Sequence, residues 1–394
     1  MKKQIKDVIT KEFKGLWGTD FSDDGIPVIK TNNMSYEGRI DYTDICIRNI
    51  TSEEAEGNFL CNGDLIIEKS GGTKTHSVGY VNIFEGEDNK YVCNNFILPI
   101  RPNRDLVNPK YLFWQLHGMY ETGRFSDCFN KTTGIQNLQK KTYYSKEINV
   151  PPLPEQQKIA EHLDSIQSAI DNKKQQLAQL DELVKSKFVE MFGENPVENG
   201  KWKVEKLDTL VQVTSSKRIY AEEQTDSGIP FLRISDLVSR INGLEQAELY
   251  ISYEKYNEFG KKGWVPTKDD ILVTTRGTLG LCYIIREDDE FYFQDGMITW
   301  LKFDNHEKVL SVFICYLFAY VLSPKFNIKS NGATVKYLSI SDLKVEKIPV
   351  PPIELQNTFA EYVQKIDSAK SIIKTQLNDL NELLESKMDF YFGE

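Results

Sequence analysis

Two 44-residue segments, 151–194 and 351–394, repeat each other, and this repeat limits the possible folds more than any other feature of the chain. Aligned without gaps at an offset of 200 residues, the two copies share 19 identical positions. Each copy begins with a Pro-Pro pair, which ends a preceding strand and favours an extended entry. Each copy closes on Phe-Gly-Glu, with glycine where a helix commonly stops. The repeat therefore predicts one long helix in each copy.

Apolar residues in both copies recur at the alternating three- and four-residue spacing of a coiled coil. A helix of about 35 residues would span about 50 Å. With a bare leucine stripe it would not be stable alone in water. Burying each Leu or Ile contributes about 1.5–3 kcal/mol, so the other copy is the expected partner. The predicted seam consists of Leu163, Ile166, Ile170, Leu177, Leu180, Val184, Val363, Ile366, Ile373, Leu377, Leu380 and Leu384.

The order of segments along the chain predicts how the two helices run. The first helix leaves one globular block and leads to the second, and the second helix must return, so the pair should be antiparallel. We expect an α+β chain with two globular blocks separated by an intramolecular antiparallel coiled coil, related by a pseudo-twofold axis. Two other interpretations are a duplication with no measuring role and seams that pair between molecules. The predicted boundaries are 1–148 and 201–347 for the blocks, 149–194 and 348–394 for the helical regions, and 195–200 for a linker.

The acidic charge of the chain is concentrated in the repeated segments. The formal net charge is −10, which at first argues against a nucleic-acid partner. Residues 1–148 hold 19 Lys and Arg against 20 Asp and Glu, and residues 200–347 hold 20 against 21. The segments 149–199 and 348–394 each carry a net charge of −4. Each near-neutral block can therefore present a basic face, and the acidic helices suit a protein partner better than DNA.

Neither the cysteines nor the histidines form a recognisable site. The six cysteines include no C-x-x-C pair and the four histidines stand alone, so neither a disulfide framework nor a zinc site is expected. The apolar run 309–322 is shorter than the roughly 20 residues that cross a bilayer, which favours a buried helix. The amino terminus lacks the pattern of a secretion signal. We expect a cytoplasmic protein with no membrane partner.

The two blocks also echo each other. "GIPVIKTNNM" (25–34) corresponds to "GIPFLRISDL" (228–237), and "GDLIIEKSGGTKTHSVGYVNIF" (63–84) to "DDILVTTRGTLGLCYII" (269–285). "TTGIQNLQKKTYYSKEINV" (132–150) corresponds to "GATVKYLSISDLKVEKIPV" (332–350). β-Branched and apolar residues run into turns of Gly, Asn, Asp, Ser and Thr, as is typical of short strands in a mixed α+β domain.

The order of block, Pro-Pro-led helix, block and Pro-Pro-led helix closely resembles the specificity subunit of Type I restriction-modification systems. The resemblance covers essentially the whole chain, and its most specific elements are "PPLPEQQKIAEHLD", the "GIP" start, "TRGTLG" and "TTGIQNL". It implies two target recognition domains that alternate with two helical regions and read a two-part DNA site. The chain departs from the pattern at "PPIELQ", at "GLWGTD" and at the weaker "EKSGG" turn. Because its two halves differ, the expected target is asymmetric.

The resemblance and the echoed loops together predict which residues contact DNA. Arg and Lys pair with guanine edges and Asn and Gln with adenine, at about 1–3 kcal/mol of discrimination per bidentate contact, while other contacts only hold phosphates. A rigid helical rod would set the spacing, since half-sites on one side of B-DNA recur about every 34–36 Å. The candidate readers are Lys30, Asn32, Asn33, Lys74, Thr75, Lys131, Gln136 and Asn137 in the first block, and Arg233, Ser235, Thr275, Arg276, Asn331, Lys336 and Tyr337 in the second.

The sequence carries no motif for chemistry of its own. The string nearest to an adenine methyltransferase motif, "NPVE" at 195–198, lacks the second proline and the aromatic residue. "SGGTKTHS" (70–77) misses the lysine spacing of a phosphate-binding loop, and Glu68-Lys69 does not match the nuclease E-x-K triplet. We therefore expect a non-catalytic chain with no cofactor.

The resemblance implies that the chemistry belongs to other subunits. These are two methyltransferase subunits that use S-adenosylmethionine and restriction, or translocase, subunits driven by ATP and Mg²⁺, with a role in defence against phage. We expect the methyltransferases to dock on the acidic helices and on the outward faces of the coiled coil. Two other classes are an interaction scaffold that binds proteins through both blocks and a fused enzyme of the Type II kind, which would carry methyltransferase motifs on the same chain.

Overall fold

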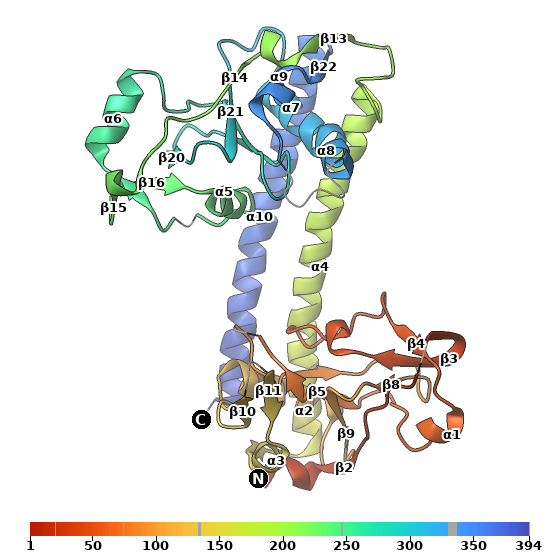
Figure 1. Cartoon of the computed structure of the whole chain (residues 1–394). Helices are drawn as coiled ribbons and strands as arrows, with labels where there is room; N and C mark the ends of the chain where they lie inside the picture. Colours follow the sequence, from red (N-terminus) through yellow and green to blue (C-terminus); the bar gives the residue numbers. More distant parts are fainter. Residues whose placement is uncertain (20, 74, 133–134, 246, 330–336, 394) are drawn as a thin grey trace. The chain divides into compact units, whose positions relative to one another are not determined.

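The computed structural model describes residues 1–19, 21–73, 75–132, 135–245, 247–329 and 337–393. The chain divides into two compact units (Figure 1). Unit 1 comprises Met1–Gln175 together with Lys374–Glu394, and unit 2 comprises Gln176–Ile373. Each unit therefore contains one globular block and parts of both long helices.

The globular part of unit 1 is built from short strands and short helices, as the residue pattern predicts. Its sheets have the strand orders β2-β9-β5-β7, β4-β3-β8, β10-β11-β6 and β1-β12. The strands are β1 (Lys2–Gln4), β2 (Ile9–Glu12), β3 (Phe21–Ile29), β4 (Cys46–Arg48), β5 (Leu65–Glu68), β6 (Ser70–Gly71), β7 (Val81–Ile83), β8 (Val92–Cys93), β9 (Ile97–Pro102), β10 (Phe129–Thr132), β11 (Ile135–Leu138) and β12 (Glu147–Asn149). The helices are α1 (Ser52–Ala55), α2 (Pro109–Glu121) and α3 (Lys140–Ser145).

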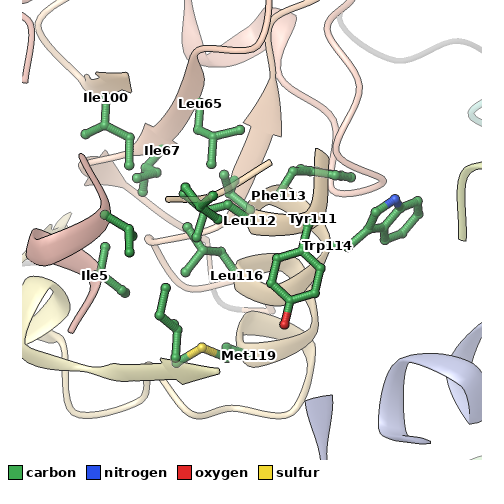
Figure 2. Close-up of a cluster of buried hydrophobic side chains, with 14 of the residues drawn as sticks. Ile5, Leu65, Ile67, Ile100, Tyr111, Leu112, Phe113, Trp114, Leu116 and Met119 are labelled. Atoms are coloured by element: carbon green, nitrogen blue, oxygen red, sulfur yellow. The ribbon is translucent and has the colours of Figure 1, made fainter. Parts of the chain in front are cut away.

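Strand β5 forms the centre of unit 1 and is buried on both faces. Because side chains alternate along a strand, Leu65 and Ile67 face one apolar cluster and Ile66 faces another. Helix α2 covers the first face, and Figure 2 shows Leu65, Ile67 and Leu112 within this cluster. Trp114 points away from the group, and its indole nitrogen donates to Asp164 of the first long helix at 2.8 Å.

The globular part of unit 2 repeats this plan with different strand lengths. Its sheets have the strand orders β14-β21-β18-β19, β15-β17-β16-β20 and β13-β22. The strands are β13 (Lys203–Lys206), β14 (Gln212–Thr214), β15 (Gln224–Thr225), β16 (Ile229–Leu232), β17 (Tyr250–Ile251), β18 (Ile271–Thr274), β19 (Cys282–Ile284), β20 (Tyr292–Phe293), β21 (Ile298–Lys302) and β22 (Lys347–Val350). The helices are α5 (Ile234–Ile241), α6 (Tyr253–Lys261), α7 (Ser311–Leu317), α8 (Ser323–Lys329) and α9 (Ile340–Lys344), with a π-helical stretch, Phe318–Leu322, between α7 and α8.

Strand β18 is the counterpart of β5. Ile271 and Val273 face one apolar cluster of unit 2 and Leu272 faces another. The sheet pairings correspond as well, since β18 lies between β21 and β19 as β5 lies between β9 and β7. The internal repeat seen in the sequence is thus a repeat of structure.

The stretch Ser311–Ile328 is a core element of unit 2. Within the described part of the chain it is the one helical stretch whose length and composition would allow it to cross a membrane. Phe313, Leu317 and Phe318 are buried in the core of unit 2, whereas Ile328 at the end of the stretch is 70% exposed. The prediction of a buried helix for this run is therefore confirmed.

Two 40-residue helices, α4 (Leu153–Phe192) and α10 (Ile353–Phe392), confirm the long helices predicted from the repeat (Figure 1). In unit 1, Nδ1 of His162 in α4 lies 2.9 Å from the Tyr391 hydroxyl, so the start of α4 meets the end of α10. In unit 2, Phe192 packs against Phe359 with ring centroids 5.5 Å apart, so the end of α4 meets the start of α10. Within each unit the two helices are therefore antiparallel, as predicted.

The seam residues are buried to different extents along the helices. Those near a globular core are buried, namely Leu163, Ile166, Ile170, Val184 and Val363. The others, Leu177, Leu180, Ile366, Ile373, Leu377, Leu380 and Leu384, are half-buried. Lys370, which replaces the isoleucine of the first copy, forms an ion pair with Asp181 of α4. This pair offsets the positive charge that Lys370 brings to the seam.

One buried glutamine at the start of each long helix fixes the helix to its globular block. Gln156 accepts a hydrogen bond from the Asn108 backbone N–H at 2.8 Å and donates to the carbonyls of Leu106 and Pro151. Gln356 accepts from the Leu310 N–H at 2.9 Å and donates to the carbonyls of Lys308 and Pro351. The repeated glutamine of "PPLPEQ" and "PPIELQ" therefore joins α4 to the start of α2, and α10 to the start of α7.

Candidate nucleic-acid interface

Two segments that the sequence singles out as echoed loops lie side by side in each unit. In unit 1, Ser70 of β6 pairs with Asn137 of β11, and the Leu138 N–H donates to the Lys69 carbonyl at 2.8 Å. In unit 2, Arg276 forms a β-bridge with Tyr337, and the Leu338 N–H donates to the Thr275 carbonyl at 3.0 Å. Ser70 therefore occupies the place of Arg276, and Asn137 that of Tyr337.

A third segment, which the sequence interpretation missed, joins each pair. It is the turn between β8 and β9 in unit 1 and between β20 and β21 in unit 2. The Phe96 carbonyl accepts the Lys69 N–H at 2.8 Å, and the Met297 carbonyl accepts the Thr275 N–H at 3.0 Å. Phe96 and Met297 hence occupy the same place. At the 200-residue offset that aligns the helices, residues 91–100 and 291–300 share no identical position, so the sequence gives no signal for this turn.

We call Ser70, Phe96 and Asn137 triad 1, and Arg276, Met297 and Tyr337 triad 2. In triad 1 the Ser70 hydroxyl donates to the Asn137 side-chain oxygen at 2.6 Å, and Phe96 is 54% exposed. In triad 2 the Arg276 guanidinium lies 5.3 Å from the centre of the half-exposed Tyr337 ring. Triad 1 is uncharged and triad 2 is cationic, so the two units offer different chemistry at the same place in the fold.

Triad 2 lies beside a cavity of about 360 Å³ in unit 2 that brings three arginines together. Arg218 forms an ion pair with Asp295 at 2.9 Å. Arg233 is bound by two carboxylates, which raise the pKa of its guanidinium. Arg276 forms no ion pair with any described residue and keeps donors for a ligand. The cavity is lined by Arg218, Ile219, Gln224, Phe231, Arg233, Leu249, Arg276, Gln294, Asp295, Gly296 and Met297.

Three predicted readers are buried inside their units, and their contact with DNA stays a prediction. Asn33 is buried and donates its amide to the carbonyls of Asp41 and Asp44. Gln136 is buried and its side-chain oxygen accepts the Val78 N–H at 3.2 Å. Thr275 is buried at the end of β18. The side chains of Asn33 and Gln136 spend these polar atoms on bonds inside unit 1.

The remaining candidate readers differ in their exposure and in the partners that they already have. Asn32 and Asn137 are exposed, Lys30 forms an ion pair with Asp44, and Ser235 donates to Asp236. Thr75 is exposed, and its hydroxyl lies within hydrogen-bond distance of Thr73 and His76. The predicted readers Lys74, Asn331 and Lys336 and the side chain of Lys131 lie outside the described residues.

A cavity of about 1220 Å³ in unit 1 lies between the globular block, the middle of α4 and the end of α10. His117 lines it, and burial lowers the pKa of this imidazole to about 4. Its Nδ1 has no hydrogen-bond partner among the described residues. No group of His, Cys, Asp and Glu in the described part of the chain could hold a metal ion.

Comparison with known proteins identifies the family of this chain. The family model described as "Type I restriction modification DNA specificity domain" matches residues 1–182 and 199–382. A putative type I restriction enzyme specificity subunit, MjaX, from Methanocaldococcus jannaschii is 23% identical over 98% of this chain and 91% of that protein. The specificity subunit of EcoKI from Escherichia coli is 22% identical over 92% of this chain and 81% of that protein.

Solved structures show the same fold. The S subunit of a Type I restriction-modification system from M. genitalium matches with a TM-score of 0.58 at 17% identity, covering 98% of this chain and 94% of that one. A chain from a study of complex assembly and conformational transition of the type I R-M system matches with a TM-score of 0.53 at 15% identity, covering 100% and 97%. With two family matches that together span most of its length, the chain belongs to the specificity subunits of type I restriction-modification systems, which are non-catalytic.

Proposed function

We propose that the chain recognises an asymmetric two-part DNA sequence, with unit 1 reading one half-site and unit 2 the other. The observation that carries this proposal is the pair of triads. The same three segments meet in both units, yet one triad presents Ser70, Phe96 and Asn137 and the other Arg276, Met297 and Tyr337. Arginine suits a guanine edge and asparagine suits adenine, so two different half-sites follow.

The long helices support a fixed spacing between the half-sites. Helices α4 and α10 are continuous over 40 residues each, and each is joined to a globular block through a buried glutamine. In this proposal the antiparallel pair sets the length of the unread gap in the target.

The family relationship supports partners that supply the chemistry. Relatives are named as specificity subunits of restriction enzymes, and one similar structure comes from work on the assembly of such a system. We infer that methyltransferase subunits, two in number, and restriction subunits bind this chain. S-Adenosylmethionine, ATP and Mg²⁺ would be held by those subunits, and this chain would bind no cofactor.

The test has two readouts on the complex of this chain with its methyltransferase subunits. Sequencing of methylated adenines should reveal one two-part asymmetric motif that disappears when this chain is omitted. Binding to a duplex with that motif should weaken steeply with salt, because phosphate contacts release counterions. Six to ten such contacts cost about 10³–10⁵ in affinity between about 50 and 200 mM salt. A complex that ignores DNA, or whose affinity is the same at both salt concentrations, would instead be a protein-binding scaffold.

A further inference from the structure

Phe96 is a large apolar residue of unit 1 whose side chain is exposed to solvent. Its exposed fraction is 54%. Its N–H donates to the Asn94 side chain at 3.1 Å, and its carbonyl accepts the N–H groups of Lys69 and Ser70. Both backbone groups of Phe96 are therefore fixed, and the ring is presented from a turn that is tied to the central sheet.

The triad partners of Phe96, Ser70 and Asn137, are uncharged, and Lys69, whose N–H bonds the Phe96 carbonyl, is half-buried. Ile135, 55% exposed, lies two residues from Asn137 on β11, so the two side chains share one face of that strand. Gln136 and Leu138 occupy the opposite face and are buried. Phe96 thus lies next to Ser70 through a backbone hydrogen bond, and Ile135 shares the exposed face of β11 with Asn137. A surface of this composition suits the edge or the face of a base, because phosphate contacts need donors and positive charge.

The corresponding turn of unit 2 has a different length and holds its side chain differently. The turn in unit 1 has three residues, 94–96, between Cys93 and Ile97, whereas that in unit 2 has four, 294–297, between Phe293 and Ile298. The additional position allows Gly296 to adopt a φ of +71°, a conformation that favours glycine. Met297 is half-buried and lines the arginine cavity instead of projecting from the surface.

We propose that Phe96 is a specificity-determining residue that makes an apolar contact with a base in the half-site read by unit 1. This inference rests on the proposed function. The contact is either with a thymine 5-methyl group or with the face of a base at an opened step, and both are ways in which apolar side chains meet DNA.

The experiment compares Phe96→Ala with Met297→Ala, the matched change in unit 2, in the full chain assembled with its methyltransferase subunits. In Phe96→Ala, discrimination at one or two adjacent positions of the unit 1 half-site should fall about tenfold or more, and the other half-site should be unchanged. Met297→Ala should leave the unit 1 half-site unchanged. Because Phe96 is exposed, its truncation opens no cavity in the core, and thermal unfolding of the variant checks this.

The mode of contact is read from modified duplexes. Replacing thymine by uracil at the affected position should weaken the parent complex and leave Phe96→Ala indifferent if the methyl group is touched. A rise in 2-aminopurine fluorescence that Phe96→Ala abolishes would show contact with an opened step. An unchanged motif and affinity in Phe96→Ala, or equal losses in both half-sites, would overturn the inference. If the parent complex methylates no two-part motif, it is the proposed function that fails.

Discussion

The three arginines that line the cavity of unit 2 differ in whether their hydrogen-bond donors are available to a ligand. Arg218 and Arg233 are neutralised by neighbouring carboxylates, whereas Arg276 contacts the ring of Tyr337. An aromatic ring holds a guanidinium in place without occupying its hydrogen-bond donors. Among the three arginines, Arg276 is therefore best suited to a bidentate contact with guanine.

We predict that Arg276→Ala relaxes recognition at one position of the unit 2 half-site by about 1–3 kcal/mol. Arg276→Lys should recover part of the affinity and little of the discrimination, because lysine lacks the planar fork. Methylated-adenine sequencing and competition binding measure both. An equal loss of affinity on all sequences would show that Arg276 contacts only phosphate.

The buried His117 should make the free energy of unfolding depend on pH. Burial lowers the pKa of its imidazole from 6.5 to about 4. The unfolded chain therefore takes up a proton near pH 6.5 that the folded chain takes up only near pH 4, so stability present above pH 6.5 is lost as the pH falls. Between about pH 7 and pH 5 this loss should be about 2 kcal/mol.

The measurement is urea unfolding at both pH values in parent and His117→Phe chains. The variant cannot be protonated at this position and should lose less stability on acidification. Burial raises the pKa of Glu121, which lines the same cavity, and this acts in the opposite direction. Comparing variant with parent cancels that contribution, and identical pH dependence in both chains would contradict the role of His117.

At this scale the sequence singles out the loops that meet, but not which of their polar side chains are buried. Asn33, Gln136 and Thr275 are polar residues in the right segments, yet they are buried. Polar side chains in turns commonly bond nearby backbone groups. A single sequence does not distinguish that use from contact with DNA. Phe96 is not among the predicted readers, since an apolar residue before a strand is usually assigned to a core.

Among the elements, the two long helices and their direction could be predicted well, because a 44-residue repeat fixes length, seam and connectivity together. The structure begins α4 at Leu153 and α10 at Ile353, just after the Pro-Pro pairs. The glutamine anchors were not predicted, although Gln156 and Gln356 are identical in the repeat. Their partners lie in the globular blocks, 48 and 46 residues earlier in the chain, and periodicity carries no information on such contacts.

We predict that Gln356→Leu lowers the stability of unit 2 by about 1–3 kcal/mol, because the Leu310 N–H and two carbonyls lose their partner inside the protein. Gln156→Leu should do the same to unit 1. Hydrogen exchange, followed separately for each unit, measures both effects. The exposed neighbour Gln157 supplies a control, and Gln157→Leu should cost far less. If Gln156→Leu proved as harmless as Gln157→Leu, the anchoring role would be wrong.

For the whole molecule, the spacing of the two half-sites is the property that the helices are proposed to set. Leu177 and Leu380 are half-buried seam positions. Leu177→Asp or Leu380→Asp places a charge in the seam and should weaken helix pairing. The expected result is tolerance of gaps longer or shorter by about one base pair, scored by methylation of a library of spacings.

The control for this prediction is a charge of the same kind outside the seam. Ala178 directly follows Leu177 on α4 and is exposed. Ala178→Asp should therefore leave the preferred spacing unchanged. A spacing preference that survives both seam variants would count against this role of the helices.

Unit 1 combines residues that the ribosome adds before unit 2 with residues that it adds afterwards. Phe392 belongs to its apolar cluster, with its ring centre 5.5 Å from that of Tyr111. The Phe392 carbonyl also accepts a hydrogen bond from Arg124. During translation, unit 2 has all its residues by position 373, whereas unit 1 must wait for 374–394. A chain that terminates near residue 380 should therefore still fold unit 2. Unit 1, although synthesised first, should remain incomplete and open to proteases.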